Sequence, residues 1–133
     1  MTSPFFIAVA QLFFGCQEAP ICENFKTGSY SVESEGMSTG YQITRTEQGQ
    51  TEKNESNEEA YYTIEWLSEC SYISKFDSSK MELTDEMKMV NSDGGIVVEF
   101  LEVIDDNCIA FQSYVKDYKD TSLTKGKFCK IEK

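Results

Sequence analysis

Residues 95–115 read GIVVEFLEVIDDNCIAFQSYV and contain two apolar-rich runs with a short polar break between them. Both runs are rich in β-branched and aromatic residues, which pack well on the surface of a sheet. The Asp-Asp-Asn sequence at 105–107 is typical of a tight turn. The stretch therefore predicts two antiparallel strands, over 95–105 and 108–115, joined by that turn.

The same period-2 alternation continues in both directions from this hairpin, with Gly, Asn and Asp between the runs. A break occurs only at 78–93, where Thr84 followed by two acidic residues predicts a short helical turn near 83–91. The run 50–56 is very polar and predicts at best a weak, exposed strand. The predicted strands are 25–33, 40–47, 50–56, 58–68, 70–77, 95–105, 108–115 and 122–129.

Consecutive short strands with tight turns are typical of an up-and-down β-barrel, in which closure leaves no edge strand. We therefore predict a small, all-β, lipocalin-like barrel of about eight antiparallel strands over residues 24–133. A two-sheet sandwich is the alternative. The chain has 133 residues and is 40% hydrophobic, which suits one folded domain.

The N-terminal segment has the pattern of an export signal. Residues 5–14, FFIAVAQLFF, are too short to span a bilayer, which takes about 20 residues, but they suit the core of a secretory signal. Gly15 and Cys16 follow, and this junction resembles the lipobox of bacterial lipoproteins. The resemblance implies a signal peptide over 1–15, lipid on Cys16 and a tether over 16–23.

Two alternatives to this interpretation remain. The apolar run could be a buried N-terminal strand or helix, or cleavage after Ala10 could leave Cys16 in the mature chain. If Cys16 is lipidated, the identity of the next residue bears on its destination. That residue is Gln17 and not Asp, which favours the outer membrane under the usual sorting rule. We therefore expect a lipid-anchored cell-envelope protein, with the membrane face left open.

The other four of the five cysteines are expected to form two disulfides, because an exported protein folds in an oxidising compartment. They lack the close pairs typical of zinc sites, so no metal site is predicted. The C-terminal hairpin would place Cys108 opposite Cys129, which leaves Cys22 with Cys70. The nested alternative stays open. It pairs Cys22 with Cys129 and Cys70 with Cys108.

Three segments together resemble a family of small lipoproteins common in Bacteroidetes-type bacteria and often labelled lipocalin-like. The shared pattern is a Cys before Phe-Lys-x-Gly, an Ile-x-Arg strand, and a Trp followed by a Cys-x-Tyr strand. The segments are CENFKTGSYSV (22–32), YQITRTEQGQTE (41–52) and YTIEWLSECSYISKF (62–76). The resemblance implies a lipocalin-like barrel in the cell envelope and the pairing of Cys22 with Cys70, but no established ligand or activity.

Charge and composition exclude several functions. The net charge is −11, so the chain has no obvious basic face for nucleic acid. It has no histidine, which removes Ser-His and Cys-His nucleophile pairs and every His-containing zinc site. We predict no catalytic residue, no metal and no cofactor. An acidic, solvated hairpin tip is expected at Glu52, Glu55, Glu58 and Glu59.

Four residues are candidates for binding a ligand. Arg45 lies on the apolar face of its strand and could hold an anion, or it could be a paired structural residue. Tyr62, Trp66 and Tyr72 could line a pocket or fill a solid core. We therefore predict a monomeric, non-catalytic binding module, either a carrier of a small hydrophobic ligand or an accessory protein of the envelope.

Overall fold

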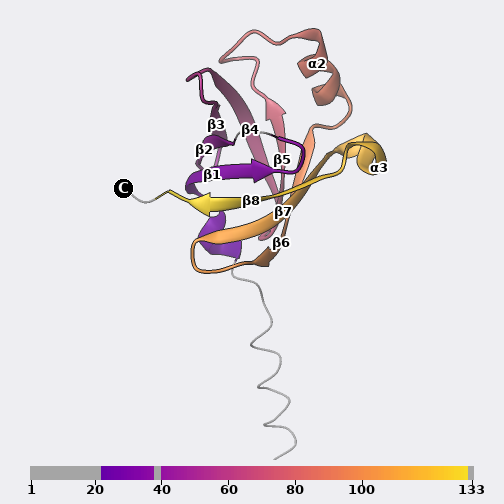
Figure 1. The fold of residues 1–133 in the computed structure, drawn as a ribbon. Coiled ribbons are helices and arrows are strands. Elements are labelled where there is room, and N and C mark those ends of the chain that lie inside the picture. Colours follow the sequence, from indigo (N-terminus) through magenta and orange to yellow (C-terminus); the bar gives the residue numbers. More distant parts are fainter. Residues whose placement is uncertain (1–21, 38–39, 132–133) are drawn as a thin grey trace, which may run out of the picture.

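The computed structural model describes residues 22–37 and 40–131, and Cys16 with the predicted signal and most of the tether lies outside them. The described chain forms a closed barrel in which each strand pairs with the next and β8 pairs with β1 (Figure 1). The predicted all-β barrel of eight antiparallel strands is thus confirmed. The strands are β1 (Gly28–Ser34), β2 (Tyr41–Arg45), β3 (Gly49–Lys53), β4 (Glu59–Ser68), β5 (Ser71–Phe76), β6 (Ile96–Val103), β7 (Cys108–Val115) and β8 (Thr124–Lys130).

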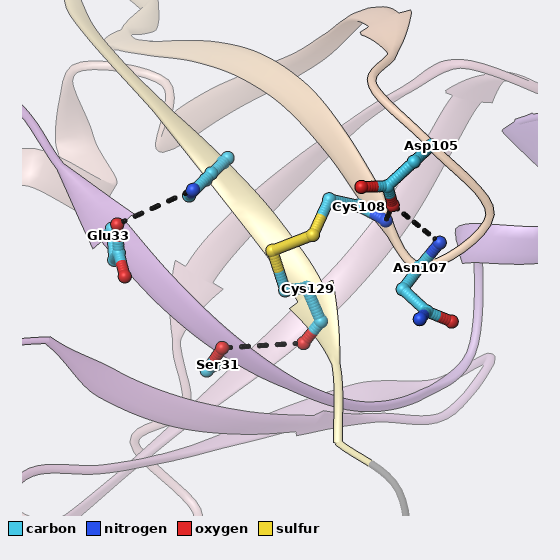
Figure 2. Close-up of a disulfide and its surroundings, with 7 residues drawn as sticks. Ser31, Glu33, Asp105, Asn107, Cys108 and Cys129 are labelled. Atoms are coloured by element: carbon cyan, nitrogen blue, oxygen red, sulfur yellow. Dashed lines mark hydrogen bonds and ion pairs between the residues drawn. A yellow bond between two sulfur atoms is a disulfide. The ribbon is translucent and has the colours of Figure 1, made fainter.

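The hairpin of β6 and β7 forms as predicted. Its register runs from Ile96 opposite Val115 to Val103 opposite Ile109, with a bulge at Leu101. Asp105 Oδ1 accepts hydrogen bonds from the backbone N–H groups of Asn107 (2.8 Å) and Cys108 (3.0 Å), as Figure 2 shows. The acidic sequence between the strands is therefore an ordinary Asx turn.

The polar strand β3 is a full member of the barrel rather than a weak, exposed strand. It pairs along its length with β2 and with β4, so its backbone is held on both sides. Gln50 lies opposite Tyr62 and Glu52 lies opposite Ile43, and cross-strand partners share a face of the sheet. Both polar side chains are thus directed into the barrel.

The helical turn predicted near 83–91 is also present, as α2 (Asp85–Ser92). Thr84 caps it, with Oγ1 accepting a hydrogen bond from Met87 N at 3.2 Å. The Asn91 side chain fastens α2 to the end of β5, because it bonds both the N–H and the carbonyl of Phe76. The connection from β7 to β8 holds two short helical turns, η2 (Lys116–Tyr118) and α3 (Lys119–Ser122), which the sequence did not predict.

Both favoured disulfides are present, and the nested pairing is wrong. Cys108 and Cys129 lie directly opposite each other in β7 and β8, with Cα atoms 4.1 Å apart (Figure 2). Cys22 bonds to Cys70, with Cα atoms 5.3 Å apart. Cys22 is buried and begins the 3-10 helix η1 (Cys22–Phe25), at the end of the barrel where β1, β5 and β7 start.

Replacing Cys108 and Cys129 by serine is expected to lower the free energy of unfolding by about 3 kcal/mol. The bond closes a loop with a sequence separation of 21, and cross-linking restricts mainly the unfolded chain. The barrel should survive, because the two strands also share backbone hydrogen bonds with their other neighbours. Urea unfolding of oxidised protein measures the difference. An unchanged unfolding free energy would contradict the estimate.

Much of the barrel interior is an aromatic core. Phe25 of η1 packs near Tyr30, with ring centroids 6.2 Å apart, and Phe111 stacks on Phe128 at 4.1 Å. Trp66 lies edge-on to Tyr72 at 4.9 Å. Neither α-helix of the described chain is long and apolar enough to cross a membrane.

Candidate functional site

A cavity of about 190 Å³ adjoins the aromatic core and shares part of its wall with it. It extends toward the end of the barrel where β2, β4 and β6 begin, away from η1. The strands alternate inward and outward residues, and each strand from β2 to β8 contributes one or two inward side chains to the wall. The lining residues are Tyr41, Ile43, Gln50, Glu52, Tyr62, Tyr72, Ser74, Ile96, Val98, Phe111, Ser113 and Phe128.

The cavity has two chemically different sides. Strands β2 to β5 contribute mainly hydroxyl, amide and carboxyl groups, among them those of Tyr41 and Gln50. Strands β6 to β8 contribute mainly apolar side chains, among them Val98, Phe111 and Phe128. A cavity of this kind suits a ligand that has both a polar group and an apolar body.

Glu52 is the only charged residue among those that line the cavity. It is half-buried, and its Oε1 accepts a hydrogen bond from the Tyr62 hydroxyl at 3.2 Å. Within residues 22–37 and 40–131 the ion pairs are Lys53–Glu59 and Lys127–Glu33, so no protein cation neutralises Glu52. Burial raises the pKa of Glu52, and the hydrogen bond from Tyr62 partly opposes this rise.

The tyrosines around Glu52 have raised pKa values, and two of them donate hydrogen bonds: Tyr62 to Glu52 Oε1 at 3.2 Å and Tyr72 to Gln50 Oε1 at 3.4 Å. Burial, and next the negative charge of Glu52, raise the pKa of both Tyr41 and Tyr62. Burial also raises the pKa of Tyr72, although the nearby positive charge of Arg45 opposes this effect. The polar side of the cavity therefore combines one carboxyl group with neutral hydroxyl groups.

Arg45 closes the barrel below the cavity. Its side chain is 1% exposed, and Nη1 donates to the carbonyl oxygens of Phe25 (2.9 Å) and Lys26 (3.4 Å). Nη2 donates to the Tyr72 hydroxyl at 2.9 Å, and Nε donates to Gln50 Oε1 at 3.1 Å. The guanidinium thus ties η1 to two residues of the cavity wall.

The structure divides the four predicted binding residues into two pairs. Tyr62 and Tyr72 line the cavity, whereas Arg45 and Trp66 lie outside its lining. Trp66 packs against Tyr72 from below, and the Lys26 ammonium lies 4.7 Å from the centre of the Trp66 ring. A ligand-binding role for the four residues stays a prediction.

Sequence reasoning missed the part that Glu52 and Tyr41 play in the cavity. The expectation that Glu52 belongs to a solvated hairpin tip was wrong, because the tip starts only after β3 ends at Lys53. Gln50 and Glu52 are two positions apart in β3, so both side chains lie on the inner face of the strand. This spacing was the signal that could have identified Glu52. A polar strand gives no hydrophobic pattern from which that face can be read.

Glu52→Gln is expected to raise the stability of the ligand-free protein near neutral pH. A carboxyl group whose folded-state pKa is raised destabilises the fold increasingly as the pH rises from its unfolded pKa to its folded pKa. The gain should shrink as the pH falls to the unfolded value of about 4.3, because Glu52 is then protonated in the wild type also. Urea unfolding across pH tests this, with the exposed Glu59→Gln as control. A variant less stable than the wild type near neutral pH would contradict it.

The chain was also compared with known proteins. No protein-family model, no curated protein and no solved structure matches it.

Proposed function

We propose that the protein is a non-catalytic binding module of the cell envelope that holds a small molecule inside its barrel. The observation that carries the proposal is the interior cavity, closed below by Arg45 and lined on opposite sides by polar and apolar groups. Its lining contains one acid, whereas hydrolysis by carboxyl groups alone uses a pair. A binding role therefore fits this cavity better than a catalytic one.

The size of the cavity limits the ligand. A volume of 190 Å³ equals that of roughly six water molecules at ~30 Å³ each. It is below the roughly 300 Å³ at which pockets for drug-sized ligands begin. Long acyl chains and large ring systems are thus disfavoured, and a compact ligand with a polar group is favoured.

The cell-envelope location rests on the cysteines. Four of the five are paired in disulfides, which persist in oxidising compartments outside the cytoplasm. The fifth is Cys16, which we propose carries the lipid that holds the protein at the outer membrane. The resemblance to the lipocalin-like lipoproteins supports the same assignment.

A thermal-shift screen against a library of small polar and amphipathic compounds tests the binding role. A ligand at about a hundred times its Kd stabilises the fold by about 2.7 kcal/mol, which raises the Tm. The control is Ser113→Phe, in which a large side chain replaces a small one on the cavity wall. We expect compounds that raise the Tm of the wild type and not of the variant. A library that shifts both proteins equally, or neither, would count against the proposal.

Intact-mass analysis of the full-length protein, extracted from its own membrane with detergent, tests the anchor. We expect a chain that begins at Cys16 and carries acyl groups, and a Cys16→Ser variant found in the soluble fraction. An unmodified chain that begins at Met1 would rule the anchor out.

A further inference from the structure

We propose that the ligand of the barrel is a small organic amine, whose ammonium group pairs with Glu52 and whose apolar body contacts the β6–β8 side of the cavity. This inference rests on the proposed binding function and adds the chemical class of the ligand. It follows from three features of the cavity: an unpaired carboxyl group, aromatic rings around it, and an apolar opposite side.

The first argument for an amine is the unpaired charge of Glu52. A carboxylate that is partly withdrawn from water is costly unless a positive group or several hydrogen bonds compensate it. Glu52 receives one side-chain hydrogen bond among residues 22–37 and 40–131, from Tyr62 to Oε1. Oε2 is not a buried atom without a partner, so it still contacts solvent in the absence of a ligand. A protonated amine would supply both the missing charge and the missing donor.

The second argument for an amine is the set of aromatic rings in the cavity wall. Tyr41, Tyr62 and Tyr72 line the polar side with Glu52, and Phe111 and Phe128 lie among the apolar residues. Cations are attracted to the faces of aromatic rings, and this attraction strengthens where water is excluded. The cavity therefore offers an ammonium group a carboxylate and several rings within one small volume.

The same features disfavour other ligand classes. An anion would meet the like charge of Glu52, and the buried guanidinium of Arg45 already donates to four protein oxygens below the cavity. A purely apolar ligand would displace water from the carboxyl group and supply neither a hydrogen bond nor a charge in its place, which is costly. A neutral alcohol would supply one hydrogen bond but no charge.

The assignment predicts a defined pH dependence. The ammonium needs ionised Glu52, so amine affinity should fall as the pH is lowered through the raised pKa of that carboxyl group. The groups that face Glu52 are Tyr62 of β4, Tyr41 of β2 and Tyr72 of β5, all of which stay neutral in this range. The affinity of a neutral ligand should not change over the same pH interval.

Isothermal titration of the full-length protein tests the inference with four probes, of which the three phenyl compounds match in size and the fourth is larger. They are 2-phenylethylamine, its neutral analogue 2-phenylethanol, the anion phenylacetate, and Nα-acetyl-lysine methylamide, which carries an ammonium on a peptide. We expect the first to bind most tightly. Glu52→Gln should weaken it about 30-fold or more, because a buried charge loses its partner. Glu59→Gln, on the outer surface beside Lys53, should leave its affinity unchanged.

The outcomes separate this inference from the proposed function. Tightest binding by 2-phenylethanol or phenylacetate, or amine binding that Glu52→Gln does not weaken, would overturn the amine assignment and leave the binding function intact. If Nα-acetyl-lysine methylamide binds most tightly, the ligand is a lysine side chain of another protein rather than a free amine. A protein that binds no probe and shows no selective thermal shift against the library would overturn both.

Discussion

Arg45→Met is expected to lower the free energy of unfolding by about 3–5 kcal/mol. Methionine fills much of the same space but removes the donor from the buried carbonyl oxygen of Phe25 and the part-buried one of Lys26. Each such group costs about 1–3 kcal/mol. The guanidinium also lies 4.7 Å from the ring centre of Tyr72 and 5.0 Å from that of Phe128, and these cation–π contacts are lost as well.

Chemical unfolding of the purified protein measures this effect. The matched control is Lys75→Met, which changes the same charge on the exposed face of β5 and should shift the unfolding free energy by less than about 0.5 kcal/mol. Arg45→Lys should recover only part of the stability, because an ammonium cannot reproduce the fork geometry of a guanidinium. A loss for Arg45→Met no larger than that of the control would show that the buried guanidinium is not structural.

Replacing Cys22 and Cys70 by serine is the second large effect, with an expected loss of about 4 kcal/mol. The sequence separation is 48, more than twice that of the other disulfide, so the bond restricts the unfolded chain more strongly. It also fastens η1 to the barrel, and η1 supplies one of the carbonyl groups that Arg45 binds. The two interactions are thus coupled through one short helix.

Comparison of the two double-serine variants tests this prediction. We expect the loss for Cys22 and Cys70 to exceed that for Cys108 and Cys129, which are also held by strand pairing. A triple variant that adds Arg45→Met should lose less than the sum of its parts, because both changes release η1. Strict additivity, or a smaller loss at Cys22 and Cys70, would contradict the coupling.

The strands with an apolar face could be predicted from the sequence. Alternation at 58–68 and 108–115 recurs in β4 and β7 within one residue, because burial of one face imposes a period of two. The same register explains why the pairing of Cys108 with Cys129 followed from the hairpin alone. The local sequence pattern was therefore sufficient to predict the pairing of strands that are neighbours in the chain and are joined by a short connection.

The cavity could not be predicted in the same way. The alternation in the sequence shows that Tyr62 and Trp66 share one face of their strand, but it does not show how far each side chain lies along the barrel. That position depends on the stagger of the strands, which places Tyr62 in the cavity lining and Trp66 outside it, packed against the core cluster. The inward direction of Glu52 depends on the pairing of β3 with both neighbours, and its polar sequence leaves that direction unmarked.

Native mass spectrometry of the full-length protein, purified from its own cells under non-denaturing conditions, tests the central claim most directly. The claim is that the barrel holds a small molecule in the cavity beside Glu52. We predict that wild-type ions carry the mass of one compact ligand, that activation in the gas phase releases it, and that Ser113→Phe and Glu52→Gln ions lack it. Wild-type ions without any bound molecule, or with the same adduct as the two variants, would contradict the claim.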